Sequence, residues 1–299
     1  MSSLARSLEN LNDADYADIC AFNYYISNGL TRDTYETLRR AFPKHLGNLQ
    51  LLFKVQKKIA ALSGLKPKYA DCCINSCCCY TGPWKDHNRC PFPECQEPRF
   101  DKFGKPRKQF QYLPIIPRLK AFFLDQEMAG KMQYRHKLTK KLPRDKVTDV
   151  FDGSLYNELR QKHVKVNGKD LPHEYFSDAR DIALGLSPDG VALFKNRKQT
   201  AWPVILFNFN LPPEIRTHLE HILCFSVIPG PKSVKDIDSF LWPLYDELVD
   251  LAKGVKTLDL QSRKFFKLHA YLLLAFGDIP AVERRFGLRS VRRQPDTAY

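Results

Sequence analysis

Four short apolar runs in the second half of this sequence constrain its fold more than any other feature. They span residues 182–186, 202–209, 222–228 and 268–276, and each is bounded by Pro, Gly, Asn or Asp. Runs of this length and composition are typical of strands. Between the third and fourth runs, apolar residues recur on one helical face, beginning near Ser233 or Asp236 and ending at Gly254. The expected order is therefore three strands, a helix and a fourth strand.

This order predicts an antiparallel meander, followed by a helical crossover to a strand parallel to the first. It corresponds to the first half of a ribonuclease-H-like fold. Asp189 closes the first run and Asp278 closes the last, so both carboxylates would lie close together on neighbouring central strands. Converging carboxylates can hold the divalent ions that promote phosphodiester chemistry. Taken separately, each Asp-Gly or Gly-Asp pair favours an ordinary turn.

Seven of the nine cysteines gather between residues 72 and 95. Cys73 and Cys77 form one closely spaced pair, and Cys90 and Cys95 form a second pair after twelve intervening residues. Two such pairs on tight turns can close a tetrahedral thiolate site around structural zinc. The neighbouring Cys72, Cys78 and Cys79 leave the choice of ligands open by one position.

The chain has a formal net charge of +14, which suggests a polyanionic partner. The charge concentrates between Arg99 and Lys146, where 14 basic residues face four acidic ones. A solvated basic surface without a ligand explains this segment equally well. The longest clean apolar stretch, 270–276, is too short to span a bilayer, and the first residues lack the apolar core of a signal peptide. We therefore expect a soluble, intracellular protein that does not bind membranes.

The pattern predicts a mixed fold, α+β or α/β, in four parts. Residues 1–66 form a helical N-terminal segment, because apolar residues recur there at helical spacing. Residues 67–112 form the zinc ribbon, and residues 113–170 form a basic linker or helical region. Residues 171–299 form the partial ribonuclease-H-like core.

A series of short motifs makes the sequence recognisable. In order they are Cys90-Pro, Cys95, Pro98-Arg-Phe, Tyr112-Leu-Pro-Ile-Ile-Pro-Arg-Leu, Asp152-Gly, Leu184-Gly-Leu-Ser-Pro-Asp-Gly, Ala201-Trp-Pro-Val, Asn210-Leu-Pro-Pro, Ile228-Pro-Gly-Pro-Lys, Asp236-Ile-Asp and Gly277-Asp-Ile-Pro-Ala. Each motif is weak alone, but their common order is very specific. From about residue 62 to 282 the chain resembles the transposases of CACTA-type (En/Spm-like) DNA elements, particularly fungal copies.

The resemblance implies a cut-and-paste transposase with a DDE-type ribonuclease-H-like domain, in which three acidic residues hold Mg²⁺ or Mn²⁺. Asp189 would be the first acid and Asp278 the second. The implied partner is DNA at transposon ends, which implies a nuclear location, and self-association is left open. Basic residues before the core would contact phosphates. They are Arg99, Lys102, Lys105, Arg107, Lys108, Arg118, Lys137, Lys140 and Lys141.

The last residues depart from the family pattern. After residue 282 the family continues into a further cysteine pair and a distant third acid, whereas this chain reads Glu283-Arg-Arg-Phe and ends at Tyr299. The sequence therefore predicts a truncated transposase relic that binds DNA and lacks activity, because one metal ligand is missing. The alternative is a non-enzymatic zinc-ribbon module that binds DNA or protein, with inert aspartates. A gene model without a present role is a third alternative.

Overall fold

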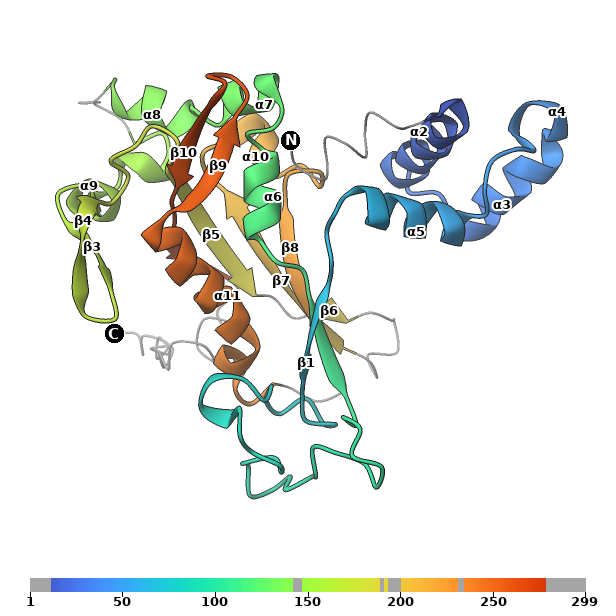
Figure 1. The fold of residues 1–299 in the computed structure, drawn as a ribbon, viewed down its shortest axis with the longest axis horizontal. Helices are drawn as coiled ribbons and strands as arrows, with labels where there is room; N and C mark the ends of the chain where they lie inside the picture. Colours follow the sequence, from blue (N-terminus) through green and yellow to red (C-terminus); the bar gives the residue numbers. More distant parts are fainter. Residues whose placement is uncertain (1–11, 142–146, 189–190, 193–199, 231–233, 278–299) are drawn as a thin grey trace, which may run out of the picture. The chain divides into compact units, whose positions relative to one another are not determined.

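The chain folds into two compact units, Met1–Lys66 and Pro67–Tyr299. The structure is a computed structural model that describes residues 12–141, 147–188, 191–192, 200–230 and 234–277 (Figure 1). Within those ranges, no helix combines the length and the apolar character that a membrane span requires.

The first unit is helical, as its sequence predicts. Its helices are α2 (Asp13–Ser27), α3 (Arg32–Ala41), α4 (Pro43–Leu46) and α5 (Leu52–Leu62). The side chain of Asn12 caps α2 by accepting a hydrogen bond from the backbone N–H of Asp15, and Thr31 caps α3 in the same way through Thr34. Lys58 on α5 forms ion pairs with Asp15 and Asp18 on α2, at 2.6 and 3.0 Å.

The second unit is built on one mixed sheet of seven strands, in the order β1-β2-β8-β7-β5-β11, with the short β6 also pairing with β7. The strands are β1 (Lys68–Asp71), β2 (Gln109–Tyr112), β5 (Ile182–Pro188), β6 (Val191–Ala192), β7 (Thr200–Asn208), β8 (Leu223–Pro229) and β11 (Ala270–Ala275). Strands β5, β7 and β8 form an antiparallel meander, and β11 runs parallel to β5. This confirms the four predicted strands and the parallel pairing of the last with the first.

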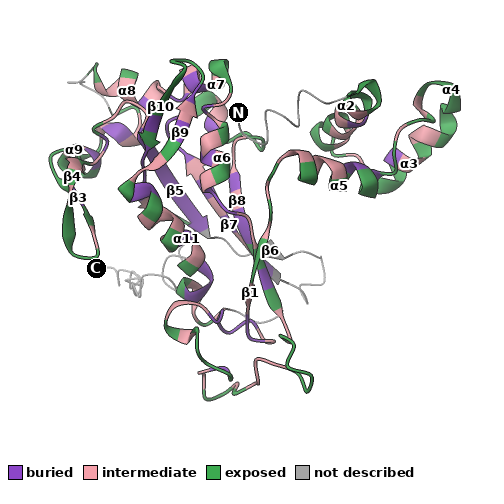
Figure 2. Cartoon of the chain, in the orientation of Figure 1, coloured by how far each residue is buried: buried purple, intermediate pink, exposed green. Residues whose placement is uncertain are grey.

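Strand β5 is buried on both faces of the sheet, which explains its nearly continuous apolar sequence (Figure 2). Ile182, Leu184 and Leu186 enter the main core, whereas Ala183 enters a second core. The alternation follows from the two-residue period of a strand. Gly185 is required by close approach, because a Cβ there would lie 2.6 Å from the ring of Phe209.

Helix α11 (Ile237–Lys253) packs its apolar face on the main core and forms the crossover between β8 and β11. Pro243 lies inside this helix and does not interrupt it. Proline cannot donate a hydrogen bond to the carbonyl four residues earlier, here that of Ser239. The hydroxyl of Thr81 donates to that carbonyl instead. The cysteine-rich segment therefore compensates for the proline in α11.

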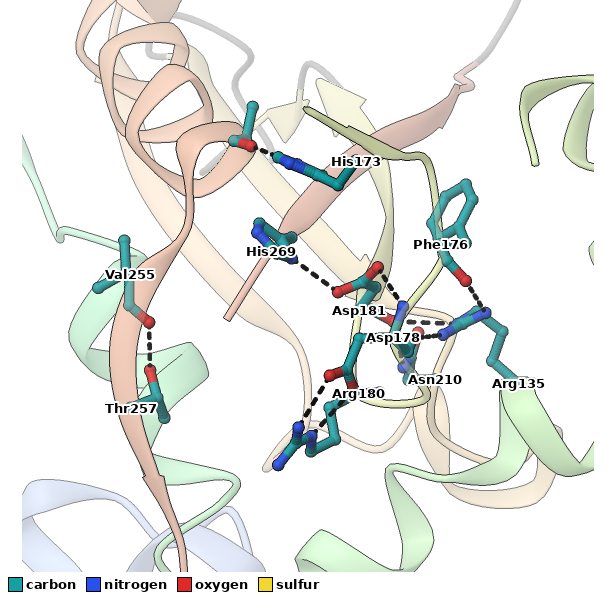
Figure 3. Close-up of polar contacts among 11 residues, drawn as sticks. Arg135, His173, Phe176, Asp178, Arg180, Asp181, Asn210, Val255, Thr257 and His269 are labelled. Carbon is teal, nitrogen blue, oxygen red and sulfur yellow. Dashed lines mark hydrogen bonds and ion pairs between the residues drawn. The ribbon is translucent and has the colours of Figure 1, made fainter. Parts of the chain in front are cut away.

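A buried polar network fixes the starts of β5 and β11 (Figure 3). Asp181 precedes β5, and one of its carboxylate oxygens lies 2.9 Å from Nδ1 of His269, which precedes β11. The side chain of Asn210 donates to the carbonyl of Asp181 and accepts from the N–H of Ala183. The guanidinium of Arg135, only 1% exposed, also donates to the carbonyl of Asp181, at 3.0 Å. The register of the parallel pair is thus held by hydrogen bonds at its N-terminal end.

The remaining elements surround the sheet. They are η1 (Gly82–Trp84), α6 (Ile116–Ala121), α7 (Gln126–Lys131), α8 (Tyr134–Thr139), η2 (Val150–Asp152), α9 (Ser154–Leu159), β3 (His163–Val166), β4 (Lys169–Glu174), α10 (Pro213–Arg216), β9 (Val255–Asp259) and β10 (Lys264–Leu268). Strands β3 and β4 form an antiparallel hairpin outside the main sheet, and strands β9 and β10 form another.

Several features differ from the predicted division into parts. The expected boundary at residue 170 falls inside β4. The segment expected as a ribbon supplies β1 and β2 to the main sheet, because β2 pairs with β8 through Tyr112 and Ser226. The hairpin β9–β10 stands in the crossover, where the sequence predicts a helix followed directly by a strand. The four-part division itself remains a prediction.

We predict that Arg135→Met destabilises the second unit by about 3 kcal/mol, because it leaves buried carbonyl groups without donors. Arg135 donates to the carbonyls of Asp178 and Asp181 and to the hydroxyl of Tyr156. The matched control is Lys137→Met, since Lys137 is exposed on the same helix. Urea denaturation should give a lower midpoint for Arg135→Met alone. Equal midpoints for the two variants would refute the structural role of Arg135.

Candidate metal centre

The first cysteine turn directly follows β1. The N–H of Cys73 donates to the carbonyl of Cys78 at 2.9 Å, and the N–H of Ser76 donates to the carbonyl of Cys73 at 2.8 Å. Ser76 adopts a φ of 58°, in the left-handed region. This backbone reversal brings Cys77 to the same side as Cys73.

The second turn repeats this arrangement. The N–H of Cys90 donates to the carbonyl of Glu97, and the N–H of Cys95 donates to the carbonyl of Phe92, both at 2.9 Å. Gln96, which follows Cys95, has a φ of 48°. Each cysteine pair thus has a tight turn with one left-handed residue, and the two turns face each other.

The four predicted cysteines converge as a compact group. The sulfurs of Cys73, Cys77, Cys90 and Cys95 all lie within 4.8 Å of one another, and the first three residues are buried. A tetrahedral zinc site with Zn–S bonds of about 2.3 Å requires sulfur separations of about 3.8 Å. The Cys73 and Cys95 sulfurs are 3.5 Å apart, too far for a disulfide, whose bond is about 2.05 Å. The donor set therefore fits a structural metal ion.

The structure also shows where the three cysteines lie whose role the sequence leaves open. Cys78 packs beside the four-sulfur group. Cys72 and Cys79 pair across an antiparallel bridge and belong to the main hydrophobic core. Among the described residues, the group that could hold a metal contains the four predicted ligands and none of these three.

Burial controls the ionisation of these thiols. It raises the pKa of Cys90 to about 11 and also raises that of Cys77. Burial acts in the same direction on Cys95, but hydrogen bonds from the Asn75 side chain and from the backbone at Glu97 outweigh it and lower the pKa to about 7. Metal binding needs thiolates, so a cation must displace protons from the buried thiols.

Helix α11 is docked directly on the first cysteine turn. The carbonyl of Cys77 accepts hydrogen bonds from the N–H groups of Lys235 and Asp236, at 3.1 and 3.0 Å. Asp236 is the N-cap of α11, and its second carboxylate oxygen accepts from the indole N–H of Trp84 at 2.6 Å. The N–H of Cys79 donates to the hydroxyl of Ser239. The segment that carries the cysteine cluster therefore supports the crossover helix.

The two predicted catalytic aspartates, Asp189 and Asp278, lie outside the described residues. The strands that precede them are described. Leu186 on β5 pairs with Ala275 on β11, and the N–H of Phe276 donates to the carbonyl of Leu186 at 2.9 Å. Each aspartate follows its member of the Leu186–Ala275 pair by three positions in the sequence.

Four of the nine predicted phosphate-binding residues make contacts within the protein. Arg99 binds the carboxylate of Asp71, and Arg107 pairs with Glu97 at 2.6 Å. Lys108 donates to the carbonyls of residues 74 and 230 and to the hydroxyl of residue 76, and Arg118 donates to the carbonyls of residues 222 and 224. The other five side chains are exposed. They are Lys102, Lys105, Lys137, Lys140 and Lys141.

Sequence reasoning does not identify the residues that support the metal centre from outside the cysteine cluster. Lys235, Asp236 and Ser239 contact the cysteine segment from more than 140 positions along the chain. The sequence indicates a structural role for Asp236, because this residue is a candidate helix start. Nothing in the sequence indicates that Trp84 is its partner. The charge of Lys108 suggests a phosphate contact, but its ammonium group binds groups within the protein.

We predict that the protein binds about one zinc ion per chain and that Cys77→Ser abolishes this stoichiometry, because three thiolates do not complete a tetrahedral structural site. Loss of the ion should also lower the thermal unfolding temperature, since metal binding is coupled to folding. Cys20→Ser is the control, because Cys20 is exposed in the first unit. Metal content measured by elemental analysis distinguishes the variants. Wild-type zinc content in Cys77→Ser would contradict the assignment.

We further predict that apparent zinc affinity rises with pH. Burial raises the pKa of Cys77 and Cys90, so both thiols are protonated at neutral pH before the ion binds. Binding releases at least these two protons, and the affinity should therefore increase by at least about 100-fold per pH unit between pH 6.5 and 7.5. Competition with a chromophoric chelator, corrected for the chelator's own protonation, measures this slope. An affinity independent of pH would show that the thiols are already ionised.

Comparison with known proteins gives a match to a family model over part of the chain. Residues 158–295 match the profile of the transposase family tnp2, a segment that begins in α9 and includes the meander, α11 and β11. No curated protein and no solved structure matches the chain. The match supports a transposase family for the part of the chain that carries the central strands.

Proposed function

We propose that this protein is a transposase-derived DNA-binding protein of CACTA type, with a ribonuclease-H-like sheet and a structural zinc centre. The match of residues 158–295 to a transposase family is the observation that carries this proposal. The exposed lysines before and beside the sheet support it, because transposases act on a polyanion. A nuclear location follows from the same proposal.

The strand pairing supports the ribonuclease-H-like part of the proposal. Two parallel neighbouring strands end at the same edge of a sheet, and β5 and β11 are such a pair. Asp189 and Asp278 follow these strands in the sequence, and we propose that their carboxylates share a divalent cation, Mg²⁺ or Mn²⁺. Hard cations of this kind prefer oxygen ligands.

Two carboxylates alone are a weak basis for turnover. Two-metal cleavage requires ligands that fix both ions on either side of the reacting phosphate. The resemblance supplies two of three acidic positions within residues 1–299. We therefore propose DNA binding without efficient strand cleavage as the activity of this 299-residue chain.

We expect the chain to bind duplex DNA with strongly salt-dependent affinity and little sequence preference. Fluorescence anisotropy between 50 and 300 mM salt measures this dependence. The triple variant Lys137→Ala, Lys140→Ala, Lys141→Ala should reduce the salt slope by about 0.9 for each phosphate that is no longer neutralised. The matched control is Lys108→Ala, whose ammonium group is engaged within the protein. Absence of DNA binding at 50 mM salt would refute the proposed function.

The same samples test the role of the aspartates. We expect no Mg²⁺- or Mn²⁺-dependent nicking of a DNA substrate, and unchanged DNA affinity for Asp189→Asn and Asp278→Asn without added metal. Metal-dependent nicking that disappears in Asp189→Ala would overturn the proposed inactivity and would identify an active nuclease.

A further inference from the structure

A hairpin with an aromatic tip extends from the segment that carries the cysteine cluster. We define the tip hairpin as residues 99–107, which belong to the segment between β1 and β2 that extends beyond the sheet (Figure 1). Its two arms pair through the Phe100–Pro106 bridge and through the N–H of Arg107, which donates to the carbonyl of Arg99 at 3.0 Å. The tip therefore has a defined conformation.

Asp101 organises the turn at the tip. One of its carboxylate oxygens accepts from the N–H groups of Phe103 and Lys105, at 2.8 and 2.9 Å. Gly104 completes the turn with a φ of 75°, and a Cβ at this position would meet nothing within 4 Å. The acidic group of the turn is thus engaged with the backbone, whereas the space around the tip is open.

The side chains that the tip presents are one phenylalanine and two lysines. Phe103 is 75% exposed, and Lys102 and Lys105 are exposed on either side of it. The ammonium group of Lys102 lies 4.9 Å from the centre of the Phe103 ring. A single exposed phenylalanine is ordinary, but here it stands at the end of a projecting turn between two cations.

The base of the tip hairpin is held firmly. The guanidinium of Arg99 binds the Asp71 carboxylate at 2.7 and 2.9 Å and lies over the ring of Tyr80. Arg107 pairs with Glu97, whose carbonyl also accepts from the N–H of Cys90 in the metal centre. An aromatic side chain inserted into another molecule must resist displacement, and this anchoring provides that resistance.

We propose that Phe103 inserts as a wedge between base pairs of duplex DNA, with Lys102 and Lys105 on the flanking phosphates. This inference rests on the DNA binding proposed above and adds the residue that makes the contact. Apolar wedges that partly unstack a base step are an established mode of minor-groove binding. Lysines are depleted in protein–protein interfaces, and the chain carries a net charge of +14. A phosphate backbone is therefore the partner that fits the tip.

Phe103→Ala tests the wedge. We expect duplex affinity to fall about 10-fold, because stacking on an aromatic side chain supplies binding free energy of that order. The salt slope should stay unchanged, since both lysines remain. A 2-aminopurine base in the duplex should brighten when wild-type protein unstacks it and should stay dark with Phe103→Ala. Phe103→Trp should retain the brightening.

The matched control is Phe265→Ala. Phe265 on β10 is 65% exposed, and the ammonium group of Lys256 lies 4.6 Å from the centre of its ring. It thus reproduces the aromatic–lysine pair without the projecting turn, and its substitution should leave affinity and 2-aminopurine signal as in wild type. Circular dichroism and zinc content verify that each variant is folded.

The possible results distinguish failure of the wedge proposal from failure of the proposed DNA-binding function. Wild-type DNA binding that Phe103→Ala leaves unchanged overturns the wedge and leaves the proposed function intact, as expected if the tip instead contacts a protein. Preferential binding to single strands without duplex unstacking also overturns the wedge. A wild-type protein that binds no DNA overturns both.

Discussion

The carbonyl group of Cys77 connects the metal centre to the sheet. It accepts two hydrogen bonds from the start of α11, and α11 is the crossover that positions β11 beside β5. The two hydrogen bonds therefore tie the first turn of the helix to the turn that carries Cys73 and Cys77. The missing donor of Pro243 reinforces this connection, since Thr81 of the cysteine segment donates to the carbonyl of Ser239. The ribbon is thus a structural part of the sheet domain.

The parallel strand pair is fixed at opposite ends by different means. At its start, the side chains of Asp181 and His269 bind each other, and the side chain of Asn210 binds the backbone of Asp181 and Ala183. At its end, Phe276 donates to the carbonyl of Leu186, and the two aspartates follow in the sequence. Parallel neighbouring strands end at the same edge of a sheet, and functional residues often follow the strands of a sheet. This arrangement favours the proposed location of a cation at that edge.

The sequence could predict the elements whose signal is local. The apolar runs identify β5, β7, β8 and β11, and the helical spacing identifies α11. The Asn167-Gly168 pair is a strong hairpin signal absent from our sequence-based expectations, since both residues have positive φ, at 49° and 77°, as a two-residue turn requires. The hairpin β9–β10 has a weaker signal, because no glycine or proline marks its turn. The spacing of the cysteine pairs predicted the four ligands with the choice open by one position, and the fold of both turns groups these four sulfurs together.

The basic residues show why charge alone could not identify an interface. Arg99 and Lys108 look the same in sequence as Lys102 and Lys105, yet the first two satisfy carboxylate, hydroxyl and carbonyl groups of the protein. Arginine in particular offers five donors in a planar arrangement, which suits buried acceptors as well as phosphates. A long basic side chain within reach of a backbone carbonyl can therefore serve the structure of the protein. What separates the two roles is whether an acceptor group of the protein lies within reach of the side chain. At the tip of the hairpin formed by residues 99–107 such groups are scarce, so Lys102 and Lys105 remain exposed.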